Sequence, residues 1–185
     1  MDKCIALATS DDVKSIFEWR QAVAHIIPLD SSLPLDPPDS DEELKDIFKS
    51  LTQWMLFWKV LDDTGNPVGW FEMDSNGEAS KIGRIQGWVK PLDRKRRWLR
   101  ANALYEILQD VFWKRNFQRV ETSLSVTQRD LIEAYFLAGF QTEGLRPGYD
   151  YSRYPGKSHC LVQLSISDTQ FTHSTGVWVF GRRCQ

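Results

Sequence analysis

The chemically most informative stretch of the sequence is a basic segment at residues 93–100. Five of the eight residues from Asp93 to Arg100 are lysine or arginine, and they run directly into an apolar-periodic segment. Cations at the start of a helix could bind phosphate, because the helix dipole and the free backbone N–H groups there also favour an anion. The same cations could instead form a nucleic-acid patch or a solvated turn.

The absence of glycine is the unusual property of this segment. Glycine lets a backbone approach phosphate oxygens closely, since any Cβ would stand between them, and residues 93–100 contain none. If the segment binds pyrophosphate, the side chains of Lys95, Arg96, Arg97 and Arg100 must replace backbone donors through charge-assisted contacts. Four cations are excessive for a turn without a partner, which favours the phosphate-binding interpretation.

Composition restricts the class of protein. The chain has 185 residues, of which 42% are hydrophobic and 26% charged, and this predicts one globular domain with a single core. Its 23 basic and 25 acidic residues give a net charge of −2, which weighs against a dedicated nucleic-acid binder. Three scattered cysteines, no apolar run of about 20 residues and no signal peptide predict a reduced cytoplasmic protein without a membrane span.

Hydrophobic periodicity predicts the elements that must position the basic segment. Apolar spacing predicts a helix over residues 13–27, and Ser40 with Glu43 has the capping-box spacing that opens a second helix. A hairpin turns at Gly65-Asn66-Pro67, and a later helix ends at Gly139. The predicted order is β-α-α-β-β-β-α-β-α-β-β, an α+β domain over residues 1–166 followed by an extension over residues 167–185.

That element order resembles the GNAT superfamily of acyl-CoA-dependent N-acyltransferases, over residues 5–166. Within the superfamily it is most similar to the branch of ribosomal-protein alanine acetyltransferases. Three segments carry the resemblance: NFQRVETSLSV (116–126), EAYFLAGFQTEGLR (133–146) and RKRRWLRANAL (94–104). The third falls where the family has its acyl-CoA loop, R/Q-x-x-G-x-G/A, with Trp98 and Arg100 at the two glycine positions.

The resemblance implies a GNAT-like twisted mixed β-sheet flanked by helices, with a splayed central pair of strands at residues 81–90 and 120–126. It implies acetyl-CoA or another acyl-CoA as co-substrate and an amine of a peptide, protein or small molecule as acceptor. The backbone of Arg84–Val89 would align the pantetheine and polarise the thioester. The cofactor-binding residues implied are Trp88, Val89, Lys95, Arg96, Arg97, Trp98, Leu99, Arg100 and Gln128, the last where the family often has an asparagine.

The resemblance also implies catalytic roles. Tyr135 stands where many GNAT enzymes carry the tyrosine that protonates the departing thiolate, although it could simply pack one helix face. The strand at residues 81–90 has no carboxylate, so Glu72 on the preceding strand is the nearest candidate for the general base. The alternative is that Glu72 is simply a charged side chain facing solvent. His25 is a further candidate. The acceptor would contact the first helix, residues 28–38 and residues 148–157.

Two other interpretations stay open. The chain could be a catalytically inactive, GNAT-shaped binding or structural protein that has lost canonical coenzyme A binding, or it could bind a polyanion such as nucleic acid through Arg94–Arg100. In the second case Trp88 and Trp98 would be stacking surfaces, and binding would depend steeply on salt. The sequence contains neither a G-x-S-x-G elbow nor H-E-x-x-H, so serine-hydrolase chemistry and a metal site are not expected.

Overall fold

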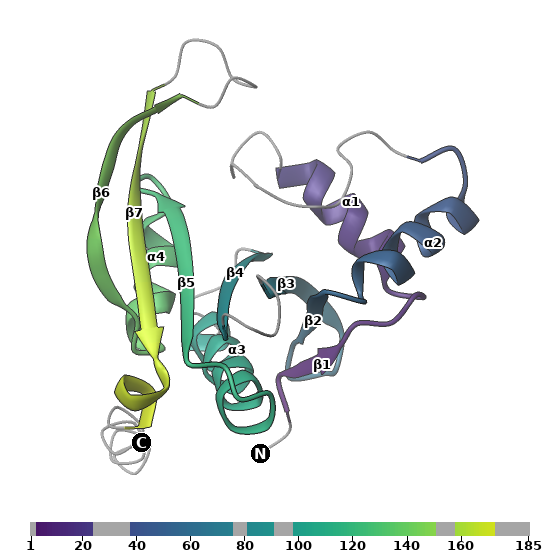
Figure 1. Cartoon of the computed structure of the whole chain (residues 1–185). Helices are drawn as coiled ribbons and strands as arrows, with labels where there is room; N and C mark the ends of the chain where they lie inside the picture. Colours follow the sequence, from purple (N-terminus) through teal and green to yellow (C-terminus); the bar gives the residue numbers. More distant parts are fainter. Residues whose placement is uncertain (1–2, 24–37, 76–80, 91–97, 151–157, 173–185) are drawn as a thin grey trace.

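A computed structural model of the chain describes residues 3–23, 38–75, 81–90, 98–150 and 158–172. The elements follow the predicted order (Figure 1). Their bounds are β1 Ile5–Leu7, α1 Val13–Val23, α2 Asp41–Leu51, β2 Met55–Leu61, β3 Pro67–Ser75, β4 Ile82–Val89, α3 Trp98–Gln109, η2 Asp110–Lys114, β5 Arg119–Ser125, α4 Arg129–Leu137, β6 Gln141–Asp150 and β7 Ser158–Ser167. The predicted α+β class is confirmed.

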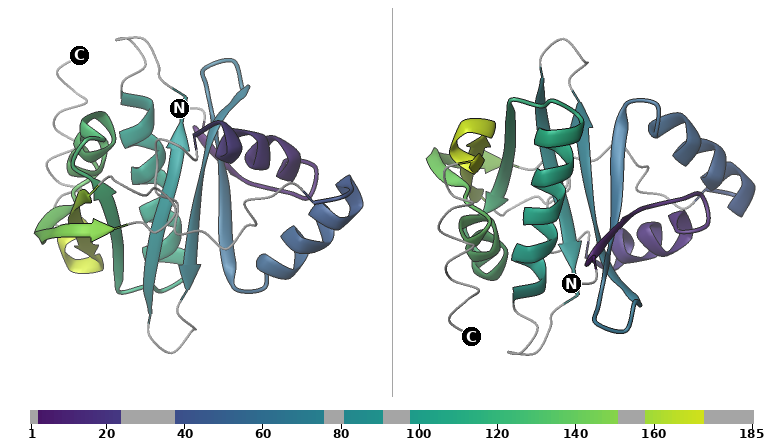
Figure 2. Two further views of the ribbon diagram at one scale, coloured as in Figure 1. Left: turned by 90° about the horizontal axis from the view of Figure 1, so that it is seen from above. Right: turned by 90° about the horizontal axis from the view of Figure 1, so that it is seen from below.

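The seven strands form one mixed sheet in the order β1-β2-β3-β4-β5-β7-β6. β4 and β5 run parallel, while the other neighbouring strands are antiparallel. Both views in Figure 2 place α1 and α2 at one end of the sheet, and α4 with the last two strands at the other. The parallel pair therefore lies between two antiparallel groups of strands.

Strand β3 is buried on both faces because helices cover each side of the sheet there. Along β3, Phe71 and Met73 pack into the core formed with α3, η2 and α4. The alternating residue Trp70 packs instead into the core formed with α1 and α2. Successive side chains of a strand point to opposite faces, so β3 contributes to both cores.

The predicted helix boundaries are confirmed at two places. Ser40 is the N-cap of α2, and its hydroxyl accepts a hydrogen bond from the N–H of Glu43 at 3.1 Å. The Glu43 carboxylate accepts from the N–H of Asp39 at 2.9 Å, one residue before the cap. Gly139, the second residue after α4, has φ of +103°, the left-handed conformation in which glycine commonly ends a helix.

The end of α3 differs from the prediction of a continuous α-helix. The last turn, η2, is a π-helix over Asp110–Lys114. Arg115 Nε donates to Asp110 Oδ2 at 2.8 Å, across the five-residue spacing that a π-turn brings onto one face. Lys114 also bonds Asp110, at 3.1 Å. Hydrophobic periodicity does not distinguish such a turn from the α-helix that it extends.

The described part of the predicted C-terminal extension packs against the domain. Residues 168–172 form a helical turn, and Phe171 is completely buried. Its ring contacts Tyr105 and Phe112, with centroid distances of 5.2 and 5.5 Å. The domain boundary at residue 166 stays a prediction.

Candidate active site

The two parallel strands at the centre of the sheet separate after a short paired region. β4 and β5 pair only at Ile82↔Arg119, Gly83↔Val120 and Arg84↔Glu121, although both strands continue beyond these pairs. β4 stays paired with β3 up to Val89, and β5 with β7 up to Ser125. We call the region beyond Arg84 and Glu121 the split. It corresponds to the splayed pair of strands that the sequence predicted.

Tyr135 lies beside the base of the split. Its side chain is completely buried, with its ring edge-on to Phe71 and Phe140 at centroid distances of 6.5 and 4.8 Å. The hydroxyl lies near that of Thr122, the first β5 residue beyond the paired region. Among the described residues neither hydroxyl has a partner with hydrogen-bond geometry. The sequence reasoning did not include Thr122, whose position in the split depends on the strand register.

Burial decides which proton chemistry Tyr135 can perform. Removal from water raises the pKa of the Tyr135 phenol well above its ordinary value, and the nearby Thr122 hydroxyl lowers that pKa only in part. A phenol with a raised pKa stays protonated at neutral pH. Tyr135 therefore cannot act as a base at neutral pH. As a weaker acid than free tyrosine, it would release its proton only to a strongly basic group that develops negative charge beside it.

Arg100 lies at the outer end of the split. It belongs to the first turn of α3, and its Nη2 donates to the carbonyl oxygen of Val89, the last residue of β4, at 2.7 Å. The Nε of Arg100 is buried without a partner among the described residues. Burial lowers the pKa of this guanidinium, while the charge of Asp130 on α4 raises it. Arg100 thus connects the first turn of α3 to the end of β4 and lies within the electrostatic influence of Asp130 on α4. It does not extend into bulk water.

The other predicted donor-binding residues have different environments. Trp98, the first residue of α3, is 36% exposed, and Leu99 is half-buried. Gln128 precedes α4, and its side-chain oxygen accepts from the N–H of Ser125 at 3.0 Å, which fixes the turn after β5. Lys95, Arg96 and Arg97 lie outside the described residues, as does His25.

Trp88 and Val89 point to opposite faces of the sheet. Val89 is buried in the core with α3, whereas Trp88 is half-buried and packs against the core with α1 and α2. The assignment of Trp88 and Val89 as donor-binding residues stays a prediction. It concerns mainly their backbone N–H and C=O groups, which would lie along the pantetheine. The side chain of Trp88 lies on the face opposite to Tyr135.

Glu72 lies on the face of the sheet under α1. It is completely buried, and its Oε1 accepts from Nε2 of Gln86 at 2.7 Å. Arg20 of α1 is buried above it: burial lowers the pKa of the Arg20 guanidinium, and the charge of Glu72 raises it. The alternative of a solvent-facing charge is therefore wrong for Glu72. A proton from a bound amine would reach this buried carboxylate only through a water molecule.

The sequence reasoning missed the partners of Glu72. Arg20 lies on the same helix face as Val13, Ile16 and Phe17, and this spacing was a signal that Arg20 would be buried. Gln86 faces Glu72 directly across the β3–β4 ladder. Only the strand register and the position of α1 bring these side chains together.

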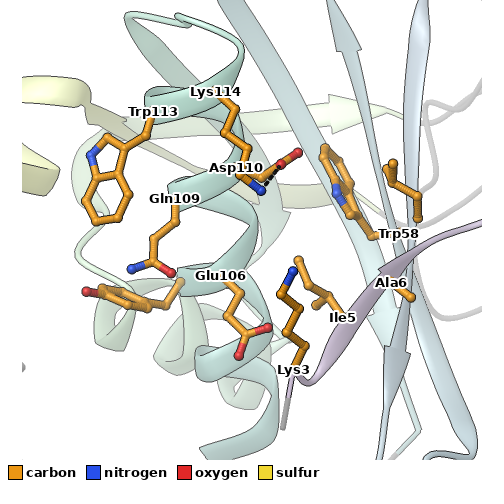
Figure 3. Close-up of a pocket in the computed structure, with 11 residues that line it drawn as sticks. Lys3, Ile5, Ala6, Trp58, Glu106, Gln109, Asp110, Trp113 and Lys114 are labelled. Atoms are coloured by element: carbon orange, nitrogen blue, oxygen red, sulfur yellow. Dashed lines mark hydrogen bonds and ion pairs between the residues drawn. The ribbon is translucent and has the colours of Figure 1, made fainter. Parts of the chain in front are cut away.

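A separate cavity lies away from the split, between the N-terminal strands and the C-terminal half of α3 with η2 (Figure 3). Its volume is about 720 Å³, and Trp58, Glu106 and Trp113 are among the residues that line it. Figure 3 shows the Asp110–Lys114 ion pair among the lining residues. None of the predicted site residues lines this cavity.

Two classes of site are not found in the described part of the chain. Residues 3–23, 38–75, 81–90, 98–150 and 158–172 contain no group of three or more His, Cys, Asp or Glu side chains able to hold a metal ion. Within the same ranges, no helix has the length and apolar character needed to cross a membrane.

The fold with its split central pair is that of the GNAT acetyltransferases. A variant of the spermidine N-acetyltransferase SpeG from Vibrio cholerae superposes with a TM-score of 0.72 at 16% identity, over 90% of this chain and 96% of that chain. The dodecameric structure of that enzyme gives a TM-score of 0.72 at 16% identity, over 90% of this chain and 94% of that chain. Its complex with manganese ions gives 0.70 at 14% identity, over 91% and 94%.

These likenesses show the fold, because all three identities are low. No protein-family model and no curated protein sequence matches the chain. The predicted GNAT-like architecture is thus confirmed by structure. The similarity to the ribosomal-protein alanine acetyltransferase branch stays a prediction.

Proposed function

We propose that the protein transfers an acyl group, acetyl or longer, from an acyl-CoA to an amine. The observation that carries this proposal is the split between β4 and β5. At its base the hydroxyls of Tyr135 and Thr122 are buried, and neither has a partner with hydrogen-bond geometry in the described part of the chain. A buried polar group without a partner costs about 1–3 kcal/mol, a cost that is removed when a ligand supplies the partner. A thioester donor bound between the strands would do so.

The reaction assigns a task to each group. The amine nitrogen attacks the thioester carbon, the C–N bond forms as the C–S bond breaks, and Tyr135 gives its proton to the leaving thiolate. Glu72 takes the proton lost by the amine through a bridging water molecule, while Gln86 orients the carboxylate. The backbone of β4 would lie along the donor, and Arg100 with residues 95–97 would bind its phosphates by charge-assisted hydrogen bonds.

Removal of two cations tests donor binding. In calorimetric titrations with coenzyme A, acetyl-CoA and a longer acyl-CoA, Arg97→Ala plus Arg100→Ala is expected to raise Kd at least about 100-fold. Two charge-assisted hydrogen bonds of about 1.5–3 kcal/mol each account for that loss. The matched control, Lys45→Ala plus Lys49→Ala on α2, removes two exposed cations and should leave Kd within about twofold.

The alternatives give different results in the same titrations. A folded protein that binds none of the three donors would contradict the proposal and favour a non-catalytic GNAT-shaped protein. Binding of single-stranded nucleic acid with a steep salt dependence, lost in Arg97→Ala plus Arg100→Ala, would instead favour the polyanion-binding interpretation.

The proposed proton donor has a separate test. Tyr135→Phe removes only the hydroxyl and is expected to lower kcat about 100-fold with acetyl-CoA and an amine, since general acid catalysis contributes about 10²–10⁴-fold. The Kd for coenzyme A should stay within about twofold. Tyr105→Phe is the control, because Tyr105 packs on Phe171 away from the split. An unchanged kcat in Tyr135→Phe would remove this residue from the mechanism.

A further inference from the structure

The face of the sheet under α1 carries an ordered set of aromatic and polar side chains. Trp70 and Glu72 on β3 lie directly opposite Trp88 and Gln86 on β4, so the two strands contribute an aromatic pair and a polar pair. The Trp70 and Trp88 rings lie 6.1 Å apart. Trp19 of α1 stacks on Trp70 at 6.3 Å with an interplanar angle of 16°. Three indole rings are thus placed beside one hydrogen-bonded carboxylate.

These five side chains differ in how far solvent can reach them. Trp70 and Glu72 are completely buried, while Trp19, Gln86 and Trp88 are half-buried. The Nε1 of Trp70 has no partner among the described residues. Trp19 and Trp88 thus present a partly exposed aromatic surface, with an unpartnered indole donor beneath it, to which a flat group can bind.

The set lies on the opposite face of the split from Tyr135. Gln86 and Trp88 belong to the part of β4 beyond its last pair with β5, Arg84↔Glu121. A donor held in the split would have its sulfur beside Tyr135 on the face that packs against α3 and α4. The amine must then reach the thioester carbon from the other face, where Gln86 and Trp88 lie.

The charges on this face select the kind of amine. A polyamine needs several carboxylates that are not already paired with a cation, whereas Glu72 here lies beside Arg20, and Glu121 and Glu143 share Arg119. Arg119 donates to Glu121 at 2.7 Å. The described charged groups of β3, β4 and β5 on this face, together with the one from α1, are Arg20, Arg84, Arg119, Glu72, Asp74 and Glu121. Glu143 of β6 adds one more carboxylate, bonded to Arg119 and Ser165.

We propose that this face is the acceptor subsite and that the acceptor is a monoamine carried on an aromatic or similarly flat apolar group. The flat group lies against Trp88 and Trp19, and the amine is directed toward Gln86 and Glu72. Indole faces attract an ammonium group and also provide apolar area for a ring. This inference rests on the proposed acyltransferase function, since it names the acceptor class of the same site.

Calorimetric titrations of the full chain with tryptamine, butylamine and spermidine test the subsite. Tryptamine is expected to bind at least about tenfold more tightly than butylamine, a difference of about 1.4 kcal/mol. Spermidine should bind no better than butylamine. Tighter binding of spermidine than of tryptamine would overturn the proposal, as would equal affinities for tryptamine and butylamine.

Substitutions of Trp88 locate the site. Trp88→Leu keeps apolar volume but removes the ring, and it should weaken tryptamine binding about tenfold, whereas Trp88→Phe should stay within about threefold of the original protein. Trp113→Ala, an exposed tryptophan at the other cavity, is the control and should change nothing. Unchanged affinity in Trp88→Leu would overturn the proposal.

Coenzyme A titrated into the same samples separates this proposal from the proposed function. Tryptamine binding that depends on Trp88, in a protein that does not bind coenzyme A, would support the aromatic-amine subsite and contradict the acyltransferase. Coenzyme A binding without Trp88-dependent amine binding would support the acyltransferase and contradict the aromatic-amine subsite.

Discussion

Arg20→Met is expected to lower the free energy of unfolding by about 3–5 kcal/mol, measured by urea denaturation. Arg20 is 3% exposed and faces the completely buried carboxylate of Glu72. Removing one partner of a buried charge pair leaves the other charge uncompensated in a poorly hydrated environment, which is the costly change. The methionine fills most of the volume, so loss of packing adds little.

Two further variants show whether the charge is responsible. Arg20→Met combined with Glu72→Leu removes both charges and should recover at least half of the lost stability, because an apolar pair can replace a buried ion pair. Arg119→Met breaks a partly exposed pair with Glu121 and should cost no more than about 1 kcal/mol. A double variant as unstable as Arg20→Met alone would show that the guanidinium acts through packing.

Gly87→Ala is expected to lower the free energy of unfolding by about 3 kcal/mol, at the upper end of the cost of overpacking. An added Cβ at Gly87 would lie 2.6 Å from Phe71 Cδ1 and 2.7 Å from Phe71 Cα, and it would also contact the carbonyl oxygen of Trp70. A side chain cannot yield to backbone atoms at such distances, so β3 and β4 would have to separate. Thermal unfolding should shift down by about 6–12 °C.

Gly144→Ala on β6 is the matched control for this prediction. An added Cβ there would meet no atom within 4 Å. Its unfolding temperature should therefore stay close to that of the original protein. If Gly87→Ala were equally harmless, the close approach of β3 and β4 would be looser in solution than in this structure.

The sequence predicted those features that depend on local patterns. The capping box at Ser40 and the helix end at Gly139 depend on residues a few positions apart, and the structure confirms both. The mixed sheet followed from the order of elements together with the resemblance to GNAT proteins. That resemblance depends on Arg119–Val120, which lie in β5, and on Gly139–Phe140, which follow the C-cap of α4.

Other features required contacts between distant segments. Burial of Glu72 depends on Arg20, which is 52 positions earlier and reaches it only because α1 lies over β3. Helical spacing predicted that Tyr135 lies on one face of its helix. It could not predict that the Tyr135 hydroxyl lies beside Thr122 of β5. Similarly, strand alternation could not show which face of the sheet Trp88 would occupy, because both faces are covered by helices.

The short ladder between β4 and β5 has a consequence for the sheet itself. Strand edges usually occur at the margins of a sheet, where a second polypeptide can pair with them and begin aggregation. Here two additional edges lie in the middle of the sheet and face each other, with α3 and α4 behind them. An extended molecule entering between them would complete the ladder without displacing any existing strand.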